Sequence, residues 1–249
     1  MPPFFFMIFN QNALCLESAL CKYNCYNQSL NLLSVDSMRR CPLCHSTQTL
    51  LLLQDKKRCF YICQTCGLTF ADANSHLPPA AEKQRYGRSR IAAKQRQLSQ
   101  FILPLLTQIQ LQQKGSLTGL NFGRVLDQTS LATIESAGHT FKQYDPFFAP
   151  DHEPLKQEYD FICCYRVFEH FQYPFKEWRL LTRLLKPGGW LAISTPLLID
   201  LEGFAKWHYK NNLTHVSFYQ RLTFEYLASN SDFELLFAAK DLVLMQKTS

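Results

Sequence analysis

The spacing of hydrophobic residues changes along the chain, and from residue 116 onward strand-like runs alternate with helical ones. Residues 159–167 form a near-continuous apolar run, which is typical of a central parallel strand covered on both faces. Strands are predicted at 117–122, 140–144, 159–167 and 190–195, helices at 128–137, 175–185 and 223–229, and a terminal antiparallel pair at 233–239 and 242–246. Repeated strand–helix units predict an α/β fold with a doubly wound, mostly parallel sheet.

Residues 82–113 carry a helical pattern that follows a linker at 71–81. Pro78 and Pro79 in this linker indicate a stop, and Pro104 is expected to start or kink a second helix. The first half of the pattern is basic, with Lys83, Arg85, Arg88, Arg90, Lys94 and Arg96. These residues favour contact with nucleic acid phosphates or, more commonly for such a pattern, a solvated helix face.

Two Cys-x-x-Cys pairs stand ahead of this linker. The four residues are Cys41, Cys44, Cys63 and Cys66, with 18 residues between the pairs. This spacing predicts a structural Zn²⁺ site, because each turn points two thiolates at one ion and two turns complete a tetrahedral S₄ shell. Short strands predicted at 50–53 and 60–62 complete the outline of a zinc ribbon, and Gly67 is free to adopt the positive φ that such a turn often needs. Accidental pairing and a redox dithiol are the alternatives.

The composition fits a protein of a reducing compartment with one small and one larger unit. The 249 residues allow a large core plus a ribbon of about 40 residues. A formal net charge of +6 permits a nucleic acid partner without requiring one. The ten cysteines do not form a disulfide framework, which favours the cytoplasm. No apolar run approaches the roughly 20 residues that a membrane span needs.

Four segments are predicted: a leader at 1–37, a zinc ribbon at 38–72, a linker and helical segment at 73–114, and a larger domain at 115–249. The leader lacks a positive charge before its apolar stretch, unlike a secretory signal. Because Met38 stands just before the first cysteine pair, we expect Met38 to be the true start and 1–37 to be a misassigned extension. A disordered leader is the alternative, and a peptide from 1–37 in the natural protein would contradict the hypothesis.

Three stretches of the larger domain resemble class I S-adenosylmethionine-dependent methyltransferases, with a pattern of the ubiquinone-biosynthesis type. They are 159–162 (YDFI), 167–171 (VFEHF) and 184–191 (LLKPGGWL), and 214–219 (THVSFY) is similar to a segment that follows the family's fifth strand. The resemblance covers roughly 115–248. It implies a Rossmann-like fold, S-adenosylmethionine as cofactor, and a methyl acceptor that is a small molecule or RNA. Small methyltransferases with an N-terminal zinc ribbon include some that modify ribosomal RNA.

The sequence departs from this family at the cofactor loop, where the first strand normally ends in an acidic residue followed by glycines at alternate positions. Asn121 stands in place of the acid, and Gly123 keeps the first glycine. Val125 and Asp127 replace the next two glycines, and a β-branched valine resists positive φ. If these two residues weaken cofactor binding, changing both to glycine is expected to tighten the binding of S-adenosylhomocysteine.

Asp145 and Tyr165 complete the set of cofactor-binding residues that the resemblance implies, beside Asn121 and Gly123. Asp145 closes the second strand, where the family's acid accepts hydrogen bonds from two ribose hydroxyls; a turn residue before Pro146 is the alternative. Tyr165 ends the fourth strand and is followed by Arg166, where the family has small or acidic residues, so Arg166 is a second departure.

Glu169 and His170 invite a catalytic role, since histidine accepts a proton near neutral pH. The resemblance instead favours a role in shaping the loop beneath the methyl group, and no catalytic residue is predicted. The aromatic-rich run ahead of His215 consists of Phe204, Trp207, His208 and Tyr209. It is expected either to line an acceptor pocket or to pack on the core as a lid.

Three functions are compatible with these patterns. The first is an active methyltransferase, and the second is a methyltransferase fold that has lost cofactor binding and serves as an interaction protein. The third is a zinc-ribbon protein that binds or modifies RNA. The strand and helix framework favours the first two, and the altered cofactor loop is the feature that separates them.

Overall fold

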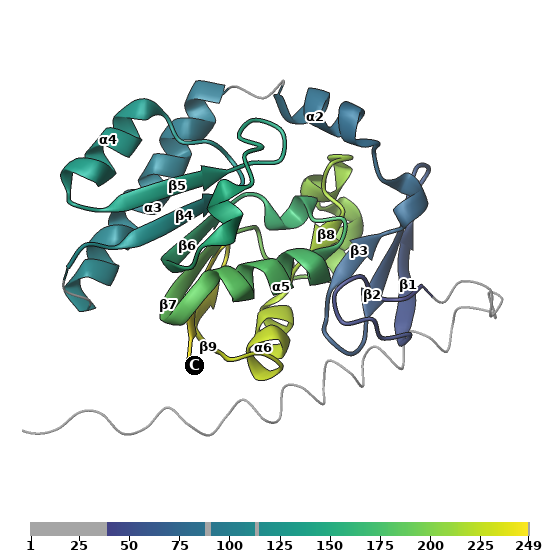
Figure 1. Cartoon of the computed structure of the whole chain (residues 1–249). Coiled ribbons are helices and arrows are strands. Elements are labelled where there is room, and N and C mark those ends of the chain that lie inside the picture. Colours follow the sequence, from purple (N-terminus) through teal and green to yellow (C-terminus); the bar gives the residue numbers. More distant parts are fainter. Residues whose placement is uncertain (1–38, 88–90, 113–114, 249) are drawn as a thin grey trace, which may run out of the picture. The chain divides into compact units, whose positions relative to one another are not determined.

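The computed structural model describes residues 39–87, 91–112 and 115–248. Within them the larger sheet has six strands in the order β5-β4-β6-β7-β10-β9 (Figure 1). They are β4 (Thr118–Phe122), β5 (Thr140–Tyr144), β6 (Tyr159–Tyr165), β7 (Leu185–Ser194), β9 (Phe233–Ala239) and β10 (Leu242–Lys247). Strands β5, β4, β6 and β7 are parallel, whereas β10 is antiparallel to both β7 and β9. The predicted fold class is therefore confirmed.

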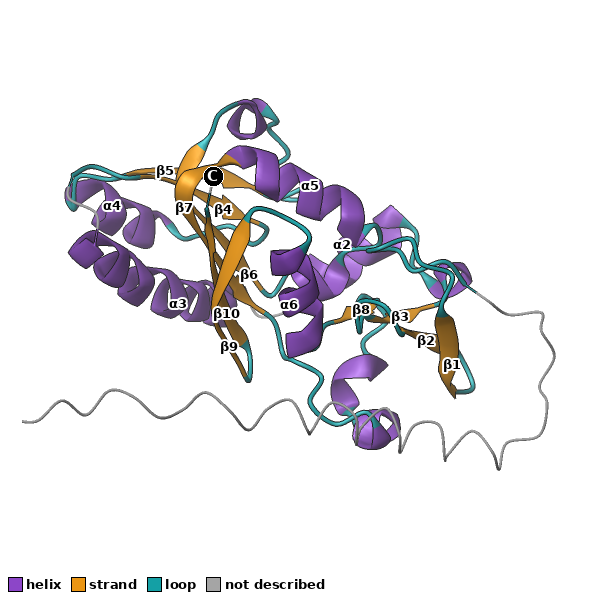
Figure 2. Cartoon of the chain, turned by 90° about the horizontal axis from the view of Figure 1, so that it is seen from below, coloured by secondary structure: helices purple, strands orange, loops and turns teal. Residues whose placement is uncertain are grey.

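Helices cover both faces of this sheet (Figure 2). Successive residues of the central strand β6 point to opposite faces, so both sets of its side chains are buried beneath helices. The helices are α3 (Ile91–Gln112), α4 (Gln128–Ser136), α5 (Pro174–Leu184) and α6 (Arg221–Ser229). Phe161 and Cys163 pack with buried residues of α3 and α4. Ile162 and Cys164 pack with buried residues of α5 and α6 on the other face. Both faces of β6 are thus largely apolar, as its near-continuous hydrophobic run predicted.

The helical segment ahead of the sheet divides at a different place from the one predicted. Helix α2 spans Pro79–Gly87, so Pro79 opens a helix, where its missing N–H is not needed. Pro104 lies inside α3, so the expectation that it starts a second helix is wrong, and the alternative of a kink there stays a prediction. Leu98, Ile102 and Leu106 of α3 are buried on the sheet, and this packing sustains the helix across the proline.

The described part of the predicted basic helix face is solvated. Lys83, Arg85 and Arg96 are exposed. Arg88, Arg90 and the side chain of Lys94 lie outside the described residues, as do the predicted leader and Met38. No helix among the described residues is long and apolar enough to cross a membrane.

A second, antiparallel sheet joins two distant segments of the chain in the order β1-β2-β3-β8. Its strands are β1 (Thr49–Gln54), β2 (Cys59–Cys63), β3 (Thr69–Ala71) and β8 (Ser217–Phe218). The sequence predicted β1 and β2 but not β3 and β8, which are too short to show a period. Because β8 lies after β7 in the chain, the cysteine-bearing segment shares its sheet with the larger domain. The predicted division at residues 38, 73 and 115 stays a prediction.

The carboxyl ends of β4, β5 and β6 point toward the side on which α2 lies (Figure 1). Ligands of open α/β sheets bind at the carboxyl ends of the strands. Short 3₁₀ helices lie in the loops, at η1 (Ala73–Ser75), η2 (Glu153–Lys156), η3 (Phe168–His170), η4 (Glu202–Lys206) and η5 (His208–Asn211). Of these, η3 directly follows the end of β6, and η4 and η5 follow β7.

Candidate cofactor and metal sites

Four sulfur atoms converge at one end of the ribbon sheet. They belong to Cys41, Cys44, Cys63 and Cys66 and all lie within 4.8 Å of one another. Cys41 Sγ is 3.6 Å from Cys66 Sγ, and Cys44 Sγ is 3.4 Å from Cys63 Sγ. All four are free cysteines. Zn–S bonds of about 2.3 Å in a tetrahedron hold sulfur atoms roughly 3.8 Å apart, so this donor set fits Zn²⁺.

Each cysteine pair lies on a turn that its own backbone closes. His45 N donates to Cys41 O at 3.0 Å, with His45 at a φ of 61°. Gly67 N donates to Cys63 O at 2.9 Å, with Gly67 at a φ of 72°, the positive value that the sequence predicted. Hydrogen bonds from Cys41 and Cys66 lower the pKa of Cys63, which favours the thiolate form of this sulfur.

At the end of β4 the chain makes a tight turn through Gly123. The φ of Gly123 is 114°, and a Cβ there would lie 3.0 Å from the Cβ of Val167. Gly123 N donates to Tyr144 O at 2.8 Å, which ties the turn to the end of β5. Asn121 is fully buried, and its Nδ2 donates to Arg124 O across the same turn. The turn therefore requires glycine at 123 and is closed by the Asn121 amide.

The two departures downstream of Gly123 have a structural explanation. Asp127 is the N-cap of α4: its Oδ1 accepts from Ser130 N and its Oδ2 from Ser130 Oγ, both at 2.9 Å. Val125 needs no positive φ, because among the described non-glycine residues only His45, Arg166 and Lys240 have one. The strain that the family's glycine pattern led us to expect at Val125 is absent from this geometry.

Asp145 lies at the end of β5 beside this turn and is 2% exposed. Its Oδ1 accepts from Phe147 N at 2.8 Å and from Phe148 N at 2.9 Å, so Asp145 does form the turn that was the alternative to a ligand role. Burial raises the pKa of Asp145, while the two backbone hydrogen bonds and the nearby Arg124 oppose that shift. The carboxylate is thus fixed at the strand end, next to Gly123 and Asn121.

Tyr165 and Arg166 turn away from these residues in two directions. The ring of Tyr165 packs against Phe101 of α3, with ring centroids 5.5 Å apart. Arg166 adopts a φ of 51°, and its Nη2 forms an ion pair with Asp241 Oδ2 at 2.7 Å in the turn between β9 and β10. The structure therefore brings together Asn121, Gly123 and Asp145 but places the Tyr165 side chain on the α3 face.

Tyr86 of α2 reaches the same sheet edge, and the sequence analysis missed it. Its ring stacks on Phe148 at 6.0 Å and contacts His170 edge-on at 5.3 Å. Cζ of Arg124 lies 4.6 Å from the centroid of the Tyr86 ring. Burial raises the pKa of the Tyr86 hydroxyl. Helix α2 is held in place by Gln172, whose Nε2 donates to Glu82 Oε2 at 3.1 Å.

A second polar group lies after β6, around the predicted Glu169 and His170. Glu169 is buried and accepts from Thr195 Oγ1 at 3.0 Å and from the Tyr209 hydroxyl. The rings of His170 and His215 meet edge-on at 4.9 Å. Each of these histidines presents Nδ1 to a backbone carbonyl at 2.9 Å, Thr214 O for His170 and Tyr209 O for His215. Burial lowers the pKa of His215 to about 4, so its ring is neutral at pH 7.

The aromatic run ahead of His215 packs on two different groups of residues. Phe204 is buried with Phe60 and Phe218 and belongs to the core. Tyr209 instead packs on His215, with centroids 4.1 Å apart, and bonds Glu169. The run is therefore a packed segment whose last aromatic residue faces the polar group.

The sequence model of a methyltransferase domain matches residues 86–237, more than half of the chain. The chain belongs to this methyltransferase family. No curated protein sequence matches it.

Solved structures similar to this methyltransferase share low identity with it. The 1,6-didemethyltoxoflavin-N1-methyltransferase of Burkholderia thailandensis, with bound 1,6-didemethyltoxoflavin and S-adenosylhomocysteine, is 12% identical over 79% of this chain and 98% of that one, with a TM-score of 0.47. An O-methyltransferase family protein of the same organism is 11% identical over 68% and 63%, with a TM-score of 0.46. A SAM-dependent methyltransferase of Thermotoga maritima is 16% identical over 67% and 99%, with a TM-score of 0.39.

The sheet edge of this methyltransferase has the chemistry that S-adenosylmethionine requires. Asn121 Oδ1 and Arg124 Nε are buried atoms without a hydrogen-bond partner among the described residues. One is an acceptor and the other a donor, so a ligand with both kinds of group satisfies them. Asp145 adds a carboxylate at the neighbouring strand end. These residues fit the cofactor.

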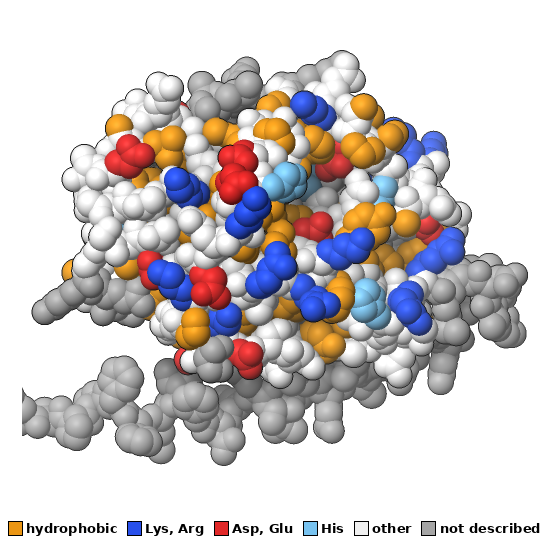
Figure 3. Space-filling view, in the orientation of Figure 1, with side chains coloured by type: hydrophobic (Ala, Val, Ile, Leu, Met, Phe, Trp, Pro, Cys, Tyr) orange, Lys and Arg blue, Asp and Glu red, His pale blue; other side chains and the backbone are white. Residues whose placement is uncertain are grey.

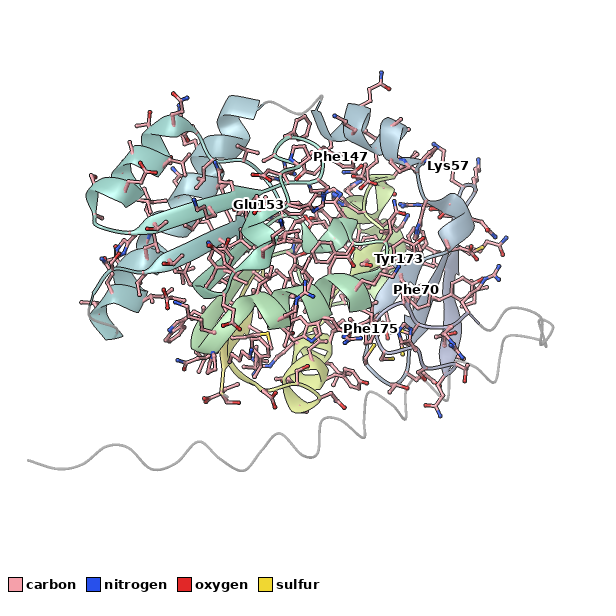
Figure 4. All side chains as sticks on the ribbon, viewed as in Figure 1. Lys57, Phe70, Phe147, Glu153, Tyr173 and Phe175 are labelled. Carbon is pink, nitrogen blue, oxygen red and sulfur yellow. The ribbon has the colours of Figure 1, made fainter. Side chains whose placement is uncertain are left out.

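The ribbon of this methyltransferase holds the segment that carries His215. Arg58, which precedes β2 and is 4% exposed, donates through Nη1 to His215 O at 2.9 Å and to Asn212 O at 3.4 Å. On the other side of the ribbon, Phe175 of α5 meets the ring of His45 at 4.4 Å (Figure 4). The partners of Arg58 are distant in the sequence, so sequence analysis could not find this residue.

Proposed function

We propose that this methyltransferase binds S-adenosylmethionine at the carboxyl ends of β4 and β5 and transfers its methyl group to an acceptor held by the loops after β6 and β7. The family match over 86–237 carries the proposal, and the position of Asn121, Gly123 and Asp145 at one sheet edge supports it. When bound, S-adenosylmethionine supplies an electrophilic methyl group on a sulfonium. The protein mainly contributes positioning and exclusion of water.

Each residue at this edge has a distinct role in the proposal. Gly123 lets the backbone come close to the ligand, because no side chain stands at the turn. Asn121 Oδ1 accepts a hydrogen bond from the ammonium group of the cofactor. Asp145 makes both turn bonds through Oδ1, so we assign Oδ2 to the ribose hydroxyls. Tyr165 was also predicted to bind the cofactor, and its packing against Phe101 favours a supporting role instead.

The polar group after β6 forms the acceptor side of the site. Because a carbonyl oxygen only accepts, the Nδ1 atoms of His170 and His215 carry their hydrogens, and both rings are anchored to the backbone. This anchoring supports the role in shaping the loop that the resemblance implied for His170. Glu169 holds the Tyr209 hydroxyl, which fixes the aromatic segment over the loop.

The four cysteines hold a structural Zn²⁺ in the proposal, and the ion's task is to brace the acceptor side. Strand β3 pairs with β8, and Ala71 N donates to Val216 O at 2.9 Å. Val216 N in turn donates to Glu169 O at 2.8 Å. A ribbon folded around the metal therefore supports the segment that carries Glu169 and His215.

Both acceptor classes, a small molecule and RNA, stay predictions. Lys and Arg side chains on the face in Figure 3 are interspersed with Asp and Glu side chains. Such a mixed surface offers no continuous track for phosphates, and a strongly basic face is what non-specific RNA binding requires. This face therefore does not raise RNA above a small molecule.

Calorimetric titration with S-adenosylmethionine and S-adenosylhomocysteine tests the proposal. Wild-type protein should bind both, and Gly123→Ala should abolish binding, because the added Cβ would press on Val167. Gly115→Ala is the matched control: Gly115 has a similar φ of 116° but nothing within 4 Å of an added Cβ. Absence of binding by the wild-type chain would instead favour an interaction protein with a methyltransferase fold.

A further inference from the structure

Arg124 occupies the cofactor loop at a position that no predicted role covers. It follows Gly123 directly, and its carbonyl accepts from Asn121 Nδ2, so both side chains belong to one turn. The guanidinium lies over the face of the Tyr86 ring at 4.6 Å. Arg124 is half-buried. An arginine on an aromatic face has a fixed plane and keeps its edge donors available for a partner.

The aromatic support beneath this guanidinium comes from two elements. Tyr86 belongs to α2, and its ring centroid lies 6.1 Å from that of Phe147 and 6.0 Å from that of Phe148, both in the loop after β5 (Phe147 is labelled in Figure 4). The three rings thus place Arg124 between α2 and the end of β5. This is the sheet edge at which the cofactor is proposed to bind.

The hydrogen-bonding capacity of the turn is not used up by the protein. Arg124 Nε is buried and without a hydrogen-bond partner among the described residues. Arg124 also takes part in none of the ion pairs found within 4.0 Å in that part of the chain. Asn121 Oδ1 on the same turn is likewise buried and unpartnered there. A buried orphan donor on a cation and a buried orphan acceptor are costly unless a ligand satisfies them.

The two unpartnered atoms, Arg124 Nε and Asn121 Oδ1, are complementary to the charged groups of an α-amino acid. A carboxylate accepts hydrogen bonds and carries the negative charge that complements a guanidinium, often through two parallel bonds. An ammonium group donates and suits the Asn121 amide oxygen. Both groups sit on the same carbon at the methionine end of S-adenosylmethionine, and two ligand groups one carbon apart suit two protein groups on one turn.

We propose that Arg124 binds the carboxylate of the cofactor's methionine end, while Asn121 Oδ1 binds its ammonium group. This inference rests on the proposed function and names a residue that the family's glycine pattern does not provide. Glycines at 125 and 127 are absent, so fewer backbone groups can approach the ligand. A charged side chain on the adjacent residue compensates for them.

The test compares two ligands that share a nucleoside but differ at the methionine end. S-Adenosylhomocysteine has the carboxylate and the ammonium, whereas 5′-methylthioadenosine carries a methyl group in their place. Wild-type protein should bind S-adenosylhomocysteine more tightly. Arg124→Met should weaken S-adenosylhomocysteine at least about tenfold, as for a lost hydrogen bond to a charged group, and should change 5′-methylthioadenosine less than about twofold. Both affinities are measured by calorimetric titration.

Further variants keep the result interpretable. Arg124→Lys should recover part of the loss, since the charge remains, and it serves as the test variant if Arg124→Met does not fold. Arg85→Met on the exposed face of α2 is the matched control and should leave both affinities unchanged. Thermal melting checks that each variant is folded.

The outcomes separate this inference from the function on which it rests. A loss confined to S-adenosylhomocysteine supports the role of Arg124. Equal losses for both ligands, no loss, or tighter binding by Arg124→Met would overturn it while leaving the proposed function in place. If the wild-type chain binds neither ligand, both the proposed function and the role of Arg124 are wrong.

Discussion

The cysteine cluster and the proposed cofactor edge are assembled from the chain in different ways. The cluster takes four identical donors from two turns within 41–66, and each turn is closed by its own backbone. The cofactor edge draws unlike groups from the ends of β4 and β5 and from α2. Several of its polar side chains also form hydrogen bonds within the protein, as Asp127 does in capping α4. A metal site can therefore be specified by local spacing, whereas this cofactor site depends on the assembled sheet.

The largest effect is expected when the cluster loses one sulfur. Cys41→Ser should reduce zinc from about one per chain toward none and unfold the ribbon, since structural Zn²⁺ contributes about 10–16 kcal/mol of apparent binding free energy in zinc-finger peptides. Elemental analysis measures the metal. Hydrogen exchange should show lost protection also at β8, because its partner β3 belongs to the ribbon.

Cys59→Ser is the control for this experiment. Cys59 lies at the start of β2, on the same strand as Cys63, but its sulfur is not part of the cluster. This variant should keep its zinc. A Cys41→Ser protein with a fully protected, metal-free ribbon would show that the cluster is not what holds the ribbon together.

The next effect tests whether the stability of the fold depends on His215 being neutral. The pKa of His215 is lowered from 6.5 to about 4 by burial. Between these values the unfolded chain binds a proton that the folded chain does not, so the free energy of unfolding decreases as pH falls from 6.5 to 4, by about 3 kcal/mol in total. Urea unfolding at several pH values measures it, and His215→Gln should flatten the dependence.

His208→Gln is the matched control, because His208 is exposed in the same aromatic segment. It should keep the pH dependence of the wild-type protein. If His215→Gln retains that dependence too, other groups are responsible for it.

A smaller effect separates the two roles of Asp145. Asp145→Asn keeps an oxygen for Phe147 N and Phe148 N but removes the charge, so stability should change little while S-adenosylhomocysteine affinity falls by about 1.5–3 kcal/mol. Asp145→Ala should lower both. Asp151→Asn, at a similar but exposed turn with Glu153, should alter neither. If Asp145→Asn binds S-adenosylhomocysteine as tightly as the wild-type protein, Asp145 only stabilises the turn and does not bind the cofactor.

The smallest effect concerns the two departures from the glycine pattern. Because Asp127 caps α4, Asp127→Ala should lower the free energy of unfolding by about 1 kcal/mol, as is usual for a lost N-cap. The Val125→Gly, Asp127→Gly double variant should not tighten S-adenosylhomocysteine binding, contrary to the expectation from sequence. Denaturant unfolding and calorimetry measure the two quantities, and tighter binding would restore that expectation.

The elements that sequence analysis located are those whose signal is local. Strand β5 was predicted with the bounds it has, 140–144, and the Cys-x-x-Cys spacing predicted the four converging sulfurs. Strands β3 and β8 have only three and two residues, too few for a hydrophobic period. Arg58 escaped prediction because its partners lie 154 and 157 positions away.

At the proposed cofactor edge, too, sequence analysis located some residues and missed others. Position in the family pattern indicated Asn121, Gly123 and Asp145, all of which lie at the strand ends. Sequence analysis predicted the helix at 128–137 but compared Asp127 only with the family's glycine pattern, so it missed the role of Asp127 as the N-cap of α4. Nor did it indicate Tyr86, an aromatic residue in a basic helix whose contacts with Arg124 and Phe148 arise only when α2 folds over the sheet.

The pairing of β3 with β8 has a consequence for the order in which the chain can fold. Gln220 Nε2 donates to Gly67 O across 153 positions, and β8 lies in the same late segment. During synthesis, the cysteine turns are complete long before β8 emerges, so the ribbon sheet has an unpaired edge throughout that interval. Contacts of such long range slow folding, and open strand edges pair with other chains. A ribbon cut off after residue 72 would keep that edge permanently and should associate with copies of itself.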